Sequence, residues 1–480
     1  MSKIKRLAGE TVLYGLGSML PKFLNFLLVS LHTSVFAPEA YGVITKVFSY
    51  VGVINVIFTF GMETAYFRFA VKAGSDEQKV FNITQSVVIG ISLFFTIIFV
   101  TSANSIASFM EVPGHSEVVL WLSAIMFIDA VVSIPFARLR LQKKAIQFAI
   151  FRIMNVAILI GLNMYFLKVV YDPAIGINYV FLANLIANVS YLVFFFKLLI
   201  TWRPAYDPIM TPKIATYAYP VMISGLAGMT NEMFSRQTLD WWLPKGFYPG
   251  KTSEYALGIF GACYKFGTFM NLAVTAFRYA AEPFFFSNAA DKESPQLFAK
   301  VNHYFVIVCC IILLGVSLNL DIIKYFLRSP LYWEGLPIVP VLLLAYLFLG
   351  IYYNLSVCFK LTDKTYFGTI ITVGGALFTV AGNYIIIPVA GYMGSTWITL
   401  ACYFLMTVAS YLLGRKLFPI PYDVGRTMSY IIGTTLLVYA ANLLTFDNQW
   451  IAILYHNGVI VSYLLTVYLV EKKDFKLASG

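Results

Sequence analysis

Long apolar runs recur from one end of the chain to the other, and short polar segments separate them. Within each run the apolar residues are continuous and do not alternate with polar ones. This pattern predicts helices and argues against the strands of a membrane β-barrel. A helix needs roughly 20 apolar residues to cross a bilayer, and the chain holds about fourteen such runs. The predicted spans are 8–32, 41–69, 80–103, 117–137, 145–167, 175–199, 213–237, 254–284, 300–322, 336–358, 365–387, 391–414, 427–445 and 450–470.

Composition supports the same class, an all-α polytopic membrane protein. Of the 480 residues, 59% are hydrophobic and only 12% are charged, and the mean hydropathy is +0.77. Soluble domains carry about 25% charged residues. The connections between the runs are short throughout, so we expect no domain outside the membrane.

Lysine and arginine in the connections set the predicted orientation. They crowd into alternate connections, beginning with Lys3, Lys5 and Arg6 at the amino terminus. This asymmetry predicts a multi-pass membrane protein with both termini in the cytoplasm. The other side holds Lys168, Arg236, Lys245, Lys251, Lys324 and Arg328.

The net charge of +11 follows from this topology and from attraction to anionic lipids. Because the basic residues are spread over many connections and form no single patch, nucleic acid is not expected as a partner. The five cysteines fall inside apolar runs and are expected to pack as small hydrophobic side chains. The four histidines have no ligand spacing, so we expect neither a metal nor another cofactor.

Two stretches of the chain correspond under one constant shift. It places Gly42 on Gly258, Tyr50 on Phe266 and Asn55 on Asn271, six predicted spans apart. A six-span offset preserves the direction of crossing, so the halves are expected to be parallel repeats. The predicted organisation is a lobe of six spans in 1–205, a second in 206–418, and two further helices in 419–480. Lobes that face each other create a central cavity, as an alternating-access transporter requires.

The segments "APEAYGVI" and "FGMETAYFRF", with "YAYPVMISG" and "EYALGIFGACYKF" at the start of the second repeat, resemble the bacterial polysaccharide exporters and lipid-linked oligosaccharide flippases. That family includes O-antigen and lipid II flippases and shares a superfamily with multidrug and toxin extrusion antiporters. The resemblance covers essentially the whole chain. It implies basic residues that face the cavity and meet a pyrophosphate, a role that falls here on Lys22, Lys46, Arg236, Lys265 and Arg278.

Charged side chains inside the predicted spans point to the same region. Each costs roughly 2.5–3.5 kcal/mol at the bilayer centre, so it must face protein or water. Lys22, Lys46 and Lys265 have no acidic residue four positions away on their own helices, which favours a cavity or a ligand as their neighbour. The accompanying acids, as supporting or ion-coupling groups, are Glu63, Asp129, Glu232, Asp240 and Glu282.

Two interpretations of the paired charges stay open. Glu232 with Arg236, and Arg278 with Glu282, are spaced i, i+4 and can neutralise one another without any ligand. Alternatively, Arg236 meets the substrate at the outer mouth of the cavity while Glu232 and Asp240 hold it. Glu63 and Asp129 are candidate proton or sodium sites.

The favoured function is a flippase that moves a polyprenyl-pyrophosphate-linked oligosaccharide for surface polysaccharide or cell-wall synthesis. The alternative is a cation-coupled multidrug and toxin extrusion antiporter, which would need acids as the dominant cavity charge. A membrane enzyme is disfavoured because the connections carry no nucleophile–base arrangement. The expected partners are membrane lipids and glycosyltransferases or a polymerase, and the two-lobe plan works as a monomer. Coupling to Na⁺, to H⁺ or to membrane potential stays open, as does the identity of the sugar.

Overall fold

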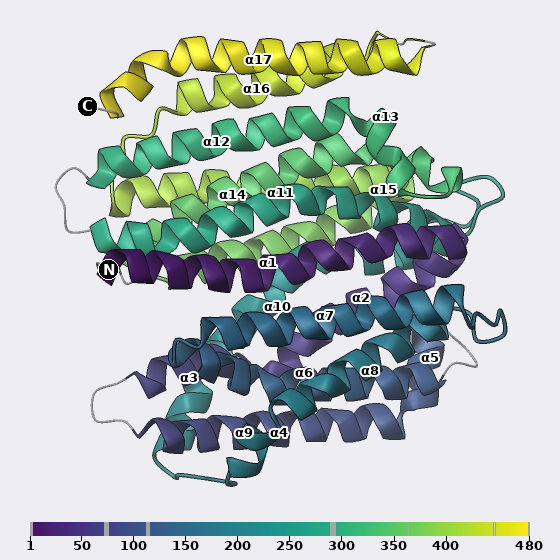
Figure 1. Cartoon of the computed structure of the whole chain (residues 1–480), viewed down its shortest axis with the longest axis vertical. Coiled ribbons are helices and arrows are strands. Elements are labelled where there is room, and N and C mark those ends of the chain that lie inside the picture. Colours follow the sequence, from purple (N-terminus) through teal and green to yellow (C-terminus); the bar gives the residue numbers. More distant parts are fainter. Residues whose placement is uncertain are drawn as a thin grey trace. The chain divides into compact units, whose positions relative to one another are not determined.

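The computed structural model describes residues 3–71, 76–111, 116–288, 294–362, 364–444, 446 and 448–478. Regular structure within these ranges is helical (Figure 1). The α-helices are α1 (Lys3–Val35), α2 (Pro38–Thr59), α3 (Met62–Ala70), α4 (Glu77–Thr101), α5 (Ala103–Phe109), α6 (Ser116–Leu141), α7 (Ala145–Lys168), α8 (Asn178–Phe194), α9 (Phe196–Thr201), α10 (Met210–Trp242), α11 (Ser253–Asn288), α12 (Ser294–Leu318), α13 (Leu320–Ile323), α14 (Ile338–Leu361), α15 (Tyr366–Leu417), α16 (Val424–Ala441) and α17 (Gln449–Ala478). Two 3-10 helices are η1 (Lys324–Phe326) and η2 (Pro330–Gly335).

Helices long and apolar enough to span a membrane number nine among the described residues. Shorter apolar helices add Met19–Val35 and Asn178–Phe194. Each predicted span overlaps one or two helices, and the all-helical polytopic class is confirmed. The structure also contains short helices that hydropathy did not separate, α5 and α9, because each continues an apolar run beyond a break.

Backbone breaks subdivide two of the long runs. The predicted span 41–69 is interrupted at Phe60 and Gly61, whose φ angles of 50° and 67° are left-handed and separate α2 from α3. The predicted gap between 387 and 391 corresponds to a kink inside α15. There Gly391 has φ 55° and ψ −142°, which glycine adopts readily because it has no Cβ.

The chain forms two compact units. The first comprises Met1–Ala262 with Thr369–Cys402, and the second comprises Cys263–Gly368 with Tyr403–Gly480. These boundaries differ from those of the predicted lobes, because α10 and the start of α11 belong with the first six spans. The lobe division itself stays a prediction.

In the first unit, α1 packs on α7, α4 on α6, α8 on both α6 and α7, and α10 on α2 and α3. A core of buried side chains joins α2, α3, α4, α6 and α10, and includes Phe58, Tyr66, Phe81 and Ile214. Phe136 of α6 meets the rings of Tyr191 and Phe195 edge-on, a favourable aromatic geometry. This packing holds α2 against α10, where the candidate site lies.

In the second unit, α12 lies alongside α14, α16 and α17 (Figure 1). Leu314 and Leu318 of α12 are buried against Val438 and Ala441 of α16. The five cysteines are free and buried, as their positions in apolar runs predicted.

Candidate functional site

Lys46 lies in the third turn of α2 with a side chain that is 0% exposed. Its Nζ is 2.9 Å from Asp240 Oδ2, 3.4 Å from Glu111 Oε2 and 3.7 Å from Glu254 Oε1. We call these four residues the Lys46 cluster. All four lie in the first unit. A buried ammonium is tolerated because carboxylates compensate its charge.

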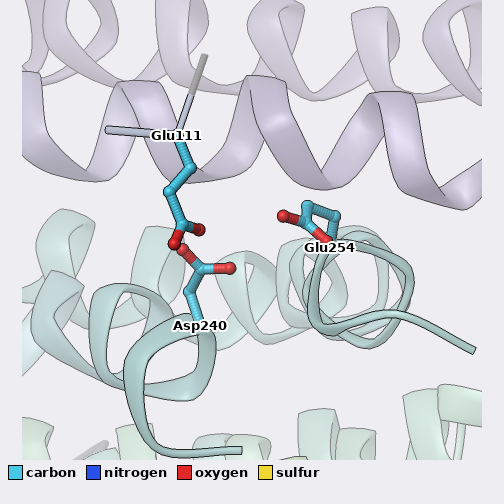
Figure 2. A group of neighbouring side chains, drawn as sticks. All are labelled: Glu111, Asp240 and Glu254. Carbon is cyan, nitrogen blue, oxygen red and sulfur yellow. The ribbon is translucent and has the colours of Figure 1, made fainter. Parts of the chain in front are cut away.

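The three carboxylates reach Lys46 from different elements, and their side chains point toward one another (Figure 2). Asp240 is in the last turn of α10, Glu254 is in the first turn of α11, and Glu111 follows α5. The amino-terminal end of a helix stabilises a negative charge, which favours Glu254. The carboxyl-terminal end disfavours one, so Asp240 depends on Lys46 for its compensation.

Exposure differs strongly among the four. The Asp240 side chain is 2% exposed, that of Glu254 26% and that of Glu111 64%. The buried pair Lys46–Asp240 therefore forms the centre of the cluster, where the low dielectric strengthens electrostatic interactions. Asp240 Oδ1 is buried and has no hydrogen-bond partner in the described part of the chain, so its other oxygen carries the interaction.

The carboxylate oxygens of Glu111, Asp240 and Glu254 lie within 4.8 Å of one another, a spacing compatible with a metal ion. Lys46 Nζ lies within 3.7 Å of all three residues. The ammonium thus supplies the positive charge that an ion would bring, and we assign no metal to this group.

Three aromatic rings meet one turn further along α2. Tyr50 lies 6.1 Å from Phe109 and 6.2 Å from Trp241, measured between ring centroids, and Phe109 is 6.2 Å from Trp241. Tyr50 comes four residues after Lys46, and Trp241 follows Asp240. Tyr50 shares α2 with Lys46, Trp241 shares α10 with Asp240, and Phe109 is in α5, which Glu111 follows. Apolar packing and ion pairing therefore both hold α2, α10 and the end of α5 together.

Two expectations about this cluster are corrected by the structure. Lys46 has acidic neighbours, although none is four residues away on its own helix. Asp240 pairs with Lys46, whereas sequence spacing had assigned it to Arg236. The i, i+4 rule considers one helix at a time, and these partners come from other elements. Glu111 and Glu254 were not singled out from the sequence. For Glu254 the sequence held one signal: the constant repeat shift aligns it with Pro38, at the start of α2, the helix that carries Lys46.

The remaining candidate cations are distributed over both units. Lys22 of α1 is exposed. Arg236 of α10 is buried, donates from Nη1 to the main-chain oxygen of Glu232 at 3.3 Å, and contacts Met233 Sδ. In the second unit, Lys265 is exposed, and Arg278 lies 4.8 Å from the ring centroid of Tyr353. That these cations face one cavity stays a prediction.

The other candidate acids have neighbours within the structure. Glu63 forms an ion pair with Arg140, and Asp129 accepts a hydrogen bond of 3.2 Å from Asn188 Nδ2. The Glu232 side chain is partly buried. The side chain of Glu282, which was predicted to pair with Arg278, lies outside the described residues. Ion coupling through any of these acids stays a prediction.

Comparisons with known proteins agree with this architecture. Residues 35–235 match the model of a family described as polysaccharide biosynthesis protein. The chain is similar to a structure of the lipid II flippase MurJ in an inward closed conformation, with a TM-score of 0.74 and 13% identity over 95% of this chain and 99% of that one.

Multidrug transporters share the fold less closely. An inward-facing MATE family transporter of the MOP superfamily gives a TM-score of 0.66 at 14% identity, over 82% of this chain and 94% of that one. An outward-facing conformation of such a transporter gives 0.59 at 14% identity, over 85% and 94%. No curated protein matches the chain in sequence. The resemblance expected from the sequence is confirmed by the match over residues 35–235 and by the shared fold.

Proposed function

We propose that the chain is a flippase for a polyprenyl-pyrophosphate-linked oligosaccharide, because residues 35–235 match the model of a family described as polysaccharide biosynthesis protein. The observation that carries the proposal is this match together with the likeness to a lipid II flippase over 95% of the chain. The proposed protein works by alternating access and catalyses no covalent step.

The physical task fits the chemistry of the chain. A lipid-linked oligosaccharide has a large, polar and anionic head group, which hydrocarbon excludes, and a tail that can remain in the bilayer. Cationic side chains at membrane depth lower the cost of moving the pyrophosphate. Lys22, Lys265 and Arg278 are exposed and are the proposed first contacts. Lys46 is compensated by carboxylates in this structure.

The proposed topology has fourteen membrane crossings. The kinked α15 supplies two of these crossings, and α2 with α3 supplies one. The other eleven come from α1, α4, α6, α7, α8, α10, α11, α12, α14, α16 and α17. Both termini face the cytoplasm of a bacterial inner membrane, because lysine and arginine concentrate in the connections on that side. With this orientation, α2 begins and α10 ends at the outer face.

A flipping assay tests the proposal. The purified chain is reconstituted into vesicles with a polyprenyl-pyrophosphate oligosaccharide that carries a fluorophore on its sugar, and an impermeant reductant is added outside. We expect the chain to increase the rate at which the inner fluorophore becomes reducible, relative to protein-free vesicles. Arg278→Ala, which removes one of the proposed first contacts, is expected to slow this rate roughly tenfold, because charge-assisted hydrogen bonds contribute about 1.5–3 kcal/mol. Arg203→Ala, an exposed arginine outside the spans, is the matched control and should leave the rate unchanged.

The alternative is a MATE-type cation antiporter, which the shared fold supports. Such a protein needs acids that are available in the cavity. In the described residues, Glu63 pairs with Arg140 and Asp240 with Lys46, so these acids are already compensated. Cation-driven efflux of a cationic dye, with no flipping of the pyrophosphate lipid, would establish the antiporter and reject the flippase.

A further inference from the structure

The Lys46 cluster joins helices that belong to different repeats of the chain. Lys46 and Glu111 come from the first predicted repeat, and Asp240 and Glu254 come from the second. The other ion pairs described in the first unit are Lys79–Asp207, Arg138–Glu77 and Arg140–Glu63, and they link α3, α4, α6 and the segment before α10. Among the described ion pairs of this unit, the Lys46 cluster alone connects α2 to the end of α10 and the start of α11.

A reciprocal glycine contact lies beside the cluster. A Cβ placed on Gly42 would lie 1.9 Å from the main-chain oxygen of Glu254, and one on Gly258 would lie 1.9 Å from that of Pro38. The repeat shift that places Gly42 on Gly258 also places Pro38 on Glu254. The two contacts are therefore equivalent across an approximate twofold relation. The first turns of α2 and α11 approach so closely that only glycine fits at these two positions.

The same relation continues one turn further along both helices. A Cβ on Gly261 would lie 2.5 Å from Thr45 Oγ1, and the repeat shift places Thr45 on Gly261. This residue pair thus lies at the approximate axis that relates α2 to α11. Lys46 follows directly after Thr45. The close contact between α2 and α11 and the ion pairs of Lys46 therefore lie side by side at the same end of α2.

We infer that the Lys46 cluster is an ionic lock that holds α2 against α10 and α11 and keeps this end of the chain closed. Opening this end requires α2 to separate from α10 and α11. Separation removes Asp240 and Glu254 from a fully buried ammonium, which is strongly unfavourable until water enters. The inference rests on the proposed alternating access, and it adds the residues that hold one end shut.

Accessibility of Thr45 provides the readout, because this half-buried side chain lies against Gly261 and loses that neighbour when α2 and α11 separate. The full chain with Thr45→Cys is placed in lipid nanodiscs, where both faces are open to solvent, and a membrane-impermeant maleimide is added. The native cysteines are buried, and the chain without Thr45→Cys gives their background rate. We expect slow labelling in this parent and labelling about tenfold faster or more after Lys46→Gln or Asp240→Asn. The first variant leaves buried Asp240 without its cation, and the second removes the nearest of the three carboxylates from the buried ammonium.

A charge reversal and a matched control make the assignment specific. Lys46→Glu combined with Asp240→Lys is expected to restore slow labelling. Lys79→Gln, which removes the ion pair between α4 and Asp207, should leave the rate at the parent value. If neither Lys46→Gln nor Asp240→Asn accelerates labelling, or if Lys79→Gln accelerates it equally, the ionic lock is refuted.

If Lys46→Gln and Asp240→Asn do not fold, Glu254→Gln tests the lock in their place. This side chain is 26% exposed and contributes the longest of the three contacts, 3.7 Å, so a smaller acceleration of a few-fold is expected. No acceleration by this variant would equally refute the lock. The labelling assay uses no glycolipid, so a failed flipping assay with accelerated labelling would reject the substrate and retain the lock.

Discussion

Arg426 Nη2 lies 2.8 Å from Glu471 Oε1 and ties the first turn of α16 to α17. The same oxygen accepts hydrogen bonds from Tyr430 at 2.6 Å and from His303 of α12 at 3.1 Å. Glu471 is 0% exposed, so a single buried carboxylate joins three helices of the second unit. The two last helices of the chain are thereby fixed to α12 by polar contacts as well as by apolar packing.

Glu471→Ala is expected to destabilise the second unit by about 3 kcal/mol, because it leaves the partners of a buried carboxylate without their acceptor. The value lies at the lower end of the usual range because Arg426 is 34% exposed. Thermal unfolding in detergent measures it. The control is Lys324→Gln, which removes an exposed ion pair within one turn and should change stability by less than about 0.5 kcal/mol. Equal effects of the two variants would show that Glu471 does not hold these helices together.

The buried pair Lys46–Asp240 predicts a strongly non-additive double mutant. Lys46→Met alone should cost about 3–5 kcal/mol, because Asp240 then remains buried without compensation. Combining it with Asp240→Leu should recover most of that loss, since an apolar pair can replace a buried ion pair. Chemical unfolding of the two single variants and the double variant gives the coupling energy. A coupling energy near zero would mean that the two side chains do not depend on each other.

The reciprocal glycine contact predicts that Gly42→Ala and Gly258→Ala are both destabilising. Each new methyl group would overlap a main-chain oxygen, and overpacking of this kind costs about 1–3 kcal/mol. Gly161→Ala in α7 is the control, because nothing lies within 4 Å of a Cβ at that position. Alanine there should be neutral or stabilising by up to about 1 kcal/mol through helix propensity. Thermal midpoints of the three variants compare these outcomes directly, and similar midpoints for all three would contradict the close contact.

Asp207, just before α10, is expected to make a pH-dependent contribution to the stability of the folded chain. Lys79 Nζ lies 2.6 Å from its carboxylate, and the main-chain N–H groups of Met210 and Ile209 donate to it, which lowers the pKa of Asp207 to about 2. The pKa of an unfolded aspartate is about 3.9, so the unfolded chain is protonated first as the pH falls. The stabilisation is therefore complete above about pH 4 and is lost as the pH falls toward about 2.

Asp207→Asn should accordingly lower the thermal midpoint at pH 5 to 7, and its difference from the parent should shrink between about pH 4 and pH 2. Lys79→Gln removes the main cause of the lowered pKa and should weaken this pH dependence. Midpoints measured by circular dichroism across this range test both statements. A difference that stays constant down to pH 2 would show that Asp207 contributes nothing through its charge.

The helices were predictable from the sequence because a bilayer imposes a local rule. Each crossing needs its own continuous apolar run, and the Pro388–Gly391 kink was visible as a gap between two such runs. The pair Gly42 and Gly258 was also visible, as matched positions in an internal repeat. What the repeat could not show was that these glycines touch the opposite helix, since correspondence in sequence does not specify which surfaces pack.

The partners of Lys46 were not predictable for the same reason. Spacing on one helix identifies neighbours within a turn, whereas Asp240, Glu254 and Glu111 arrive from elements far along the chain. Burial also required the structure, because hydropathy placed Lys46 inside an apolar run without saying whether it faces water, lipid or carboxylates. The sequence by itself determined the class, the helices and the repeat, since each depends on local apolar length and pattern. Only the tertiary structure decided that the ammonium of Lys46 is neutralised, because the compensating charges converge through helix packing.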